Sequence, residues 1–147
     1  MKQTMHLVKS VALAVLGCAL SLSSRVMAAD VVAVVSFKSS VTALSANQVA
    51  DIFLGKANRF PDGSQAVPID QAEGTPARDE FYAKVTGKSA AQMKAHWSKI
   101  IFTGRGQPPK EVATGAEAKK LVAGDPKAIG YIEQDQVDGS VRVLLSP

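Results

Sequence analysis

The sequence predicts a single α/β domain of three layers, with a mostly parallel sheet between helices. Short valine- and isoleucine-rich segments alternate with segments that carry helix caps, and this alternation favours a parallel sheet covered by helices. The composition is 46% hydrophobic and 20% charged, which provides enough apolar side chains for a hydrophobic core. A length of 147 residues suits one domain and excludes a large multidomain enzyme.

Residues 1–28 have the parts of a secretory signal peptide. Two lysines precede an apolar run over residues 11–22, and small or modest side chains lead to a cleavage site after Ala28. We therefore expect residues 29–147 to form one exported domain, in the periplasm or outside the cell.

A lipoprotein is the alternative. The tetrapeptide that ends at Cys18 loosely resembles a lipobox, and processing there would tie the chain to a membrane through this cysteine. Either route leaves the domain without a thiol or a disulfide, because Cys18 is the only cysteine. The stability of the domain must then come from its core.

The formal charge of +4 does not indicate nucleic-acid binding. Three of the 17 Lys and Arg residues lie in the first 28 residues, and all 13 acidic residues lie beyond them. The remaining 14 cations nearly balance the 13 acids, so we expect no basic surface and no nucleic-acid partner.

The first two predicted strands flank a helix with clear ends. Residues 31–36 form a valine-rich run, typical of a strand buried on both faces. Ser45 is a good N-cap and Gln48 completes a capping box, so a helix should start after Ser45 and end at Gly55. Residues 66–69 form the second strand, after a loop rich in turn residues.

Two further helices follow. Thr75 is the N-cap of a helix whose first position is Pro76, and Gly87 ends it. Ser89 caps the next helix, and Gly104 ends that one. The predicted buried stripe of this later helix consists of Met93, Trp97, Ile100 and Ile101.

The last part of the chain predicts one helix and two strands. Thr114 and Glu117 form a capping box for a helix that ends at Gly124. Residues 128–133 and 140–145 have the apolar character of strands.

The start of the Thr75 helix is suited to an anion. Three of the four predicted helices carry Gln or Glu at the third helical position, but here that position holds Arg78. A cation there opposes the helix dipole, whereas free amides, Gly74 and the guanidinium together suit a bound anion. Asp70 and Gln71 lie in the preceding turn, at the carboxyl edge of the sheet, where α/β folds bind ligands. The predicted ligand site therefore consists of Gly74, Thr75, Arg78, Gln71 and Asp70.

A purely structural interpretation stays open. A favourable helix start needs no ligand, and Arg78 could instead pair with Asp70, Glu73 or Asp79. Asp79 and Glu80 already complement the helix dipole and would repel an anion held close by.

Three segments resemble a known family. Residues 44–55 (LSANQVADIFLG), 67–81 (VPIDQAEGTPARDEF) and 128–131 (AIGY) look like successive landmarks of the phosphate-type substrate-binding proteins of ABC transporters. Those proteins have two α/β lobes of the type II periplasmic binding fold, which close on phosphate. The resemblance implies that this chain corresponds to a single lobe.

The resemblance also carries a binding motif. Proteins of this family bind phosphate through a Ser-Gly-Thr turn at a helix N-terminus, with an arginine shortly before it. Gly74 and Thr75 match, Glu73 stands where the serine would be, Ile69 stands about where the arginine would be, and Arg78 is the nearest cation. The resemblance therefore implies a non-catalytic protein that binds phosphate or a related oxyanion. We expect the affinity to be weak, unless a second copy, a transporter or a receptor completes the cleft.

The alternative function is a periplasmic protein-interaction module that has kept the fold and lost the small ligand. An enzyme is not expected, because beyond residue 28 the chain has one histidine, His96, and no cysteine. No nucleophile–base pair or metal-ligand cluster has a recognisable spacing, so we predict no catalytic residue, metal or cofactor. Trp97 is expected in the core and Arg105 in a flexible turn.

Overall fold

The computed structural model describes residues 30–147, so the predicted signal peptide and Cys18 lie outside the described residues. The elements in chain order are β1 (Val31–Ser36), α1 (Ala46–Phe53), β2 (Val67–Gln71), α2 (Pro76–Thr86), α3 (Ala90–Phe102), β3 (Lys110–Val112), α4 (Gly115–Gly124), β4 (Ala128–Glu133), the 3₁₀ turn η1 (Gln134–Gln136) and β5 (Val141–Leu145). Within residues 30–147, no helix is both long enough and apolar enough to cross a membrane.

The five strands form one mixed sheet with the order β3-β2-β4-β1-β5. β2 pairs in parallel with both β3 and β4, whereas β1 pairs antiparallel with both β4 and β5. Four strands therefore run in one direction, and β1 alone among the described strands opposes them. The predicted α/β class is confirmed, and the sheet is mixed because β1 lies antiparallel between β4 and β5.

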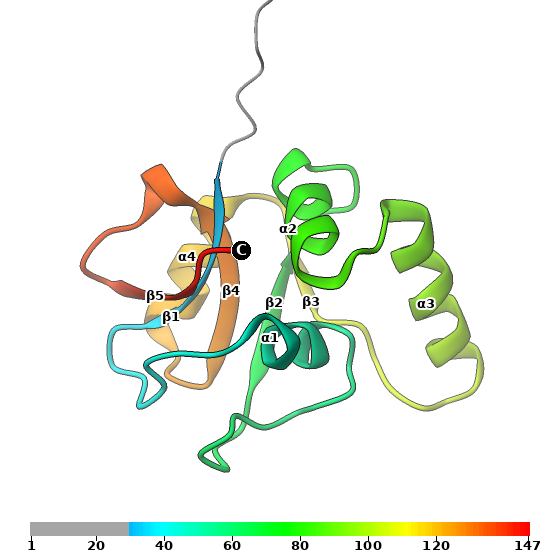
Figure 1. Cartoon of the computed structure of the whole chain (residues 1–147), viewed down its shortest axis with the longest axis horizontal. Helices are drawn as coiled ribbons and strands as arrows, with labels where there is room; N and C mark the ends of the chain where they lie inside the picture. Colours follow the sequence, from blue (N-terminus) through cyan, green and yellow to red (C-terminus); the bar gives the residue numbers. More distant parts are fainter. Residues whose placement is uncertain (1–29) are drawn as a thin grey trace, which may run out of the picture.

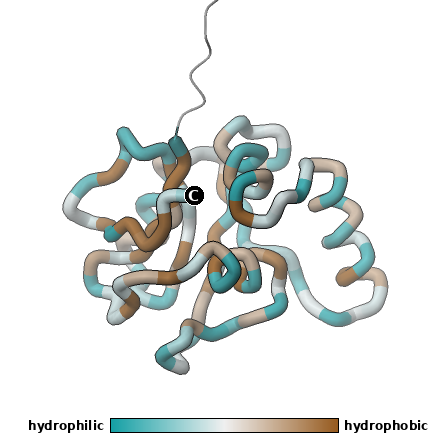
Figure 2. Tube along the Cα trace, viewed as in Figure 1, coloured by the Kyte–Doolittle hydropathy of each residue, from teal (hydrophilic) through white to brown (hydrophobic). Residues whose placement is uncertain are grey.

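Helices cover both faces of this sheet (Figure 1). On one face, Val31, Ala33 and Val35 pack into a core shared with α1, α2 and α3. On the other face, Val32 and Val34 pack against α4. Because every residue of β1 is buried, the strand is apolar on both faces, as its valine-rich sequence predicts. Figure 2 shows hydrophobic stretches along the central strands and hydrophilic ones in the outer loops.

The helix caps follow the sequence closely. Ser45 and Ser89 form reciprocal capping boxes with Gln48 and Gln92, as predicted. At α4 the Thr114 side chain accepts a hydrogen bond from the amide of Glu117, but the Glu117 carboxylate accepts from Ala113 rather than from Thr114. The third predicted box is therefore only half formed.

Three local predictions need correction. Strand β2 extends to Gln71, so Asp70 and Gln71 lie in the strand and not in a turn after it. Strand β3 was not predicted, because its three residues are short and mostly exposed and carry no strand signal. Ile101 is 52% exposed and does not belong to the core. Figure 1 shows α3 beyond α2 at the side of the molecule. Met93 and Trp97 of this helix are buried and Ile100 packs against the core, so only part of the predicted stripe faces inward.

Candidate functional site

Asp70, at the end of β2, is the centre of a buried polar cluster. The residue is only 3% exposed. The hydroxyls of Tyr82 and Tyr131 donate to its carboxylate at 2.8 and 2.5 Å, and the amide of Gln71 donates at 2.8 Å. Nε of Arg78 lies 3.4 Å from Oδ2, which makes an ion pair but not a hydrogen bond. The cluster therefore ties together β2, α2 and β4.

Gln71 has a structural position beside this cluster. It is 3% exposed, and its Nε2 donates to the backbone carbonyl of Tyr131 at 2.9 Å. The backbone pairing of β2 with β4 covers only Val67 and Pro68. The Gln71 side chain thus continues the link between the two strands where the backbone ladder has ended.

Aromatic rings enclose the cluster. Phe81 stacks on Tyr131 with ring centroids 4.1 Å apart, and its ring meets Phe53 edge-on at 4.9 Å. Tyr82 meets Phe53, Phe81 and Tyr131 edge-on. Such contacts favour a rigid environment and exclude water from the Asp70 carboxylate.

Burial and the negative charge of Asp70 raise the pKa of both tyrosines well above the ordinary value of 10.0. Folding therefore favours the neutral hydroxyls. Their contribution to stability is present below about pH 10, the pKa of an unfolded tyrosine, and is lost as the pH rises above it.

Tyrosine ionisation is expected only when the protein unfolds. Tyr82 and Tyr131 are the only tyrosines of the chain, so tyrosinate absorbance reports these two groups alone. At about pH 11 the folded protein should show almost no tyrosinate, and the signal should appear together with loss of secondary structure at higher pH. Titration near pH 10 with an unchanged circular dichroism spectrum would contradict the buried hydrogen bonds to Asp70.

Arg78 links the buried cluster to the surface. Its side chain is 13% exposed, and the guanidinium lies over the Tyr82 ring at 5.6 Å. Burial is the largest single effect and acts to lower the pKa of Arg78. The Asp70 carboxylate, together with Tyr82, Tyr131 and Glu111, outweighs it, so the pKa is raised. Nε of Arg78 is buried and has no hydrogen-bond partner within residues 30–147, so the protein leaves part of the donor capacity of the guanidinium unused.

The first turn of α2 is not capped by its own side chain. The hydroxyl of Thr75 donates to the carbonyl of Ala72 at 2.9 Å and accepts no amide of the helix. The amides of Ala77 and Arg78 lie in the first turn, where an α-helix offers no carbonyl partner. Gly74 has a φ of +87°, and a Cβ there would meet nothing within 4 Å. This helix start is therefore open to solvent.

Glu73, which precedes the α2 start, lies close to a lysine of the neighbouring helix α3. Its side chain is 56% exposed, and a carboxylate oxygen lies 3.8 Å from Nζ of Lys94 in α3. The pairing offsets part of the negative charge beside the α2 start, although an exposed pair of this kind is weak.

The predicted site residues thus fall into two groups. Gly74, Thr75 and Arg78 lie together at the open start of α2, whereas Asp70 and Gln71 lie beneath them in the buried cluster. Of the three acids offered as partners for Arg78, the ion pair forms with Asp70.

Sequence reasoning missed both tyrosines of the cluster. Tyr82 follows Arg78 by four residues, a spacing that places both on one face of α2, so this signal was present in the sequence. Tyr131 lies on β4, and no local pattern connects it to Asp70. Within the described residues, no three His, Cys, Asp or Glu side chains gather as metal ligands.

Three solved structures with a similar fold are described as phosphate-transport proteins. A phosphate ABC transporter substrate-binding protein with bound phosphate from Clostridium perfringens matches with a TM-score of 0.62 and 24% identity. An ABC-type phosphate transport receptor from Vibrio cholerae matches with 0.61 and 19%, and PstS from Borrelia burgdorferi with 0.56 and 14%. At these identities the likeness concerns the fold.

This chain spans less than half the length of those proteins. Each match covers 78% of this chain but only 44–46% of the other one. The predicted resemblance to one lobe of a phosphate-type substrate-binding protein is confirmed at the level of the fold. No family model and no curated protein matches the sequence.

Proposed function

We propose that this chain is an exported, non-catalytic binding protein that holds phosphate or a related small oxyanion at the start of α2. The observation that carries the proposal is the position of Arg78, which the Asp70 carboxylate holds beside an uncapped helix N-terminus. The fold it shares with phosphate-transport proteins supports the same ligand class.

The chemistry of this corner suits an oxyanion. Amides at a helix N-terminus point outward and the helix dipole favours negative charge. Arg78 adds a planar set of donors that can bind two oxygens at once. Since its Nε is paired with Asp70, the guanidinium keeps one orientation and loses little conformational freedom on binding.

Binding by this lobe alone is expected to be weak. An open helix start leaves the ion partly hydrated, so each hydrogen bond replaces one already made to water. A dissociation constant of about 1 mM corresponds to a binding free energy of about −4 kcal/mol, which a few such contacts can supply. A transporter, a receptor or a second copy that covers the site would raise the affinity by excluding water.

Replacement of Arg78 by lysine is expected to weaken phosphate binding about tenfold. Lysine keeps a cation near Asp70 but lacks the planar fork, so the loss is that of bidentate geometry. Titration calorimetry with phosphate measures the effect, and Lys120→Gln is the control, because Lys120 is exposed on α4, away from the α2 start. Equal phosphate affinity in the Arg78→Lys variant and the parent protein would contradict the assigned site.

Glu73→Ser tests the same site in the opposite direction. This change removes a negative charge beside the α2 start, and it is expected to strengthen phosphate binding about fivefold, since charges about 4 Å apart interact by about 1 kcal/mol in water. Weaker binding or no change would show that the ion does not lie near Glu73.

A protein-interaction module is the second candidate function. The observation in its favour is the exposed apolar end of α3, where Phe102 is 92% and Ile101 is 52% exposed. A partner that covers this end should bind the Glu73→Ser variant as tightly as the parent protein, and it should bind Phe102→Ser more weakly. A stable partner together with no measurable phosphate binding by the parent protein would favour this candidate.

A further inference from the structure

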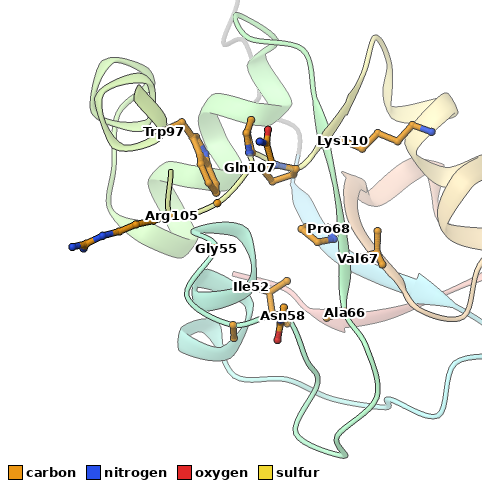
Figure 3. A pocket seen from close by; sticks show the side chains of 14 residues that line it. Ile52, Gly55, Asn58, Ala66, Val67, Pro68, Trp97, Arg105, Gln107 and Lys110 are labelled. Atoms are coloured by element: carbon orange, nitrogen blue, oxygen red, sulfur yellow. The ribbon is translucent and has the colours of Figure 1, made fainter. Parts of the chain in front are cut away.

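A cavity lies at the opposite end of β2 from the α2 start. Its volume is about 420 Å³, and it lies between the end of α1, the helix α3, the loop over residues 105–109 and the first residues of β2. Figure 3 shows Trp97 on one side and Ile52, Val67 and Pro68 on the other. We refer to it as the Trp97 cavity. It lies at the amino end of β2, whereas α2 begins beyond the carboxyl end of that strand.

The cavity forms because α3 and the loop after it leave a space beside α1 and β2. The helix packs at the side of the molecule, and the chain then returns to β3 through a loop with Gly104, Gly106, Pro108 and Pro109, which cannot form a helix. Gly55 ends α1 with a φ of +75°, and a Cβ at this residue would lie 2.9 Å from the Trp97 ring. Glycine thus lets Trp97 lie against the end of α1, and the ring and this turn form one wall.

The lining of the cavity is mixed, because apolar side chains lie beside amide and cationic ones. Ile52 is 2% exposed and Trp97 is 7% exposed, and both line the cavity. Asn58 and Gln107 add amide groups, and Arg105 and Lys110 supply the charges. None of the described residues that line the cavity is acidic.

The rim belongs to a wider positive segment. From residue 81 to residue 110 the chain carries six Lys and Arg residues and no Asp or Glu. Neither Arg105 nor Lys110 has an ion-pair partner within residues 30–147. Figure 3 shows the Arg105 and Lys110 side chains pointing away from the cavity on opposite sides. Both residues are exposed, so a change of rotamer would bring either charge to the mouth of the cavity.

We propose that the Trp97 cavity is a second binding site, for a small amphipathic acid with an apolar body and one anionic head group. The apolar body would lie against Ile52 and Trp97, and the head group would stay at the mouth, near Arg105 and Lys110. A volume of about 420 Å³ is within the range of small-molecule sites. This site goes beyond the oxyanion site and does not depend on it.

The fluorescence of Trp97 provides a direct test, because it is the only tryptophan of the chain and lines the cavity. Titration of the purified protein with 4-phenylbutyrate should change the emission in a saturable way. The neutral analogue 4-phenylbutanol should bind at least about fivefold more weakly, since it keeps the apolar body and lacks the charge. Acetate, which has the charge and no apolar body, should leave the emission unchanged.

Two variants separate the two parts of the site. Arg105→Gln together with Lys110→Gln should weaken 4-phenylbutyrate about fivefold to tenfold and leave 4-phenylbutanol unchanged. Ala57→Leu adds bulk to a residue that lines the cavity and should remove binding of both compounds. The double variant changes exposed side chains only, so it keeps the test decisive if Ala57→Leu does not fold.

Lys120→Gln is the control. Lys120 is exposed on α4, at the other face of the sheet, so this variant should bind 4-phenylbutyrate like the parent protein. Inorganic phosphate should not displace 4-phenylbutyrate, which keeps failure at one site distinct from failure at the other. No saturable change in emission, equal binding of acid and alcohol, or an unaffected double variant would each overturn the proposal.

Discussion

Replacement of Asp70 by alanine is expected to lower the free energy of unfolding by about 3–5 kcal/mol. The change leaves a buried guanidinium without its counter-charge, and removal of one partner from a buried pair typically costs this much. The hydroxyls of Tyr82 and Tyr131 also lose their acceptor in a region that water does not reach. Urea unfolding followed by circular dichroism measures the loss.

Asp79→Ala is the matched control for Asp70. Asp79 is exposed in the first turn of α2, where its carboxylate interacts with the helix dipole. Its removal is expected to cost no more than about 1 kcal/mol. A loss below about 1 kcal/mol for Asp70→Ala as well would mean that the buried cluster does not hold α2 on the sheet.

Phe81→Ala is expected to cost about 3–5 kcal/mol of stability. Phe81 has no exposed surface, it stacks on Tyr131, and it contacts Phe53. Loss of a buried phenyl ring removes its transfer free energy and leaves a cavity between α2 and the sheet. The variant should also weaken oxyanion binding, because α2 carries both the free amides and Arg78.

Phe102→Ala is the matched control for Phe81→Ala. The residue type is the same, but Phe102 is 92% exposed, so the stability should change by no more than about 0.5 kcal/mol. Urea unfolding of the two variants under one condition compares them directly. Similar losses for both would contradict the assignment of the core.

Most of the fold could be predicted from local signals. Capping residues mark the starts of α1 and α3, glycines with positive φ follow α2 and α3, and runs of valine and isoleucine mark the two central strands. These signals depend on a few neighbouring residues, so one sequence is enough to read them. β3 was missed because its three residues owe their strand conformation to pairing with β2.

The arrangement of the residues around the proposed site could be predicted only in part, for a physical reason. Gly74, Thr75 and Arg78 are close in sequence, and the chemistry of a helix start connects them. Asp70 looked like a turn residue, because a buried carboxylate is rare unless it has partners, and one partner, Tyr131, is 61 residues away along the chain. Polar residues that end a buried strand therefore need long-range contacts before their role can be assigned.

The Trp97 cavity had no sequence signal at all. The sequence predicts Trp97 in the core and Arg105 in a flexible turn; the structure confirms that Trp97 is buried, at 7% exposed, and places Arg105 on an exposed loop. Trp97 and Arg105 line one cavity only because α3 and the loop after it return toward the end of α1.

Amide chemical shifts during a phosphate titration test the oxyanion site most directly. At constant ionic strength, added phosphate should move the amide signals of Gly74, Thr75, Ala77 and Arg78 along one saturable curve, while signals around Trp97 stay in place. If those four amides do not respond at tens of millimolar phosphate, or if the response is confined to another part of the chain, the start of α2 does not bind the ion.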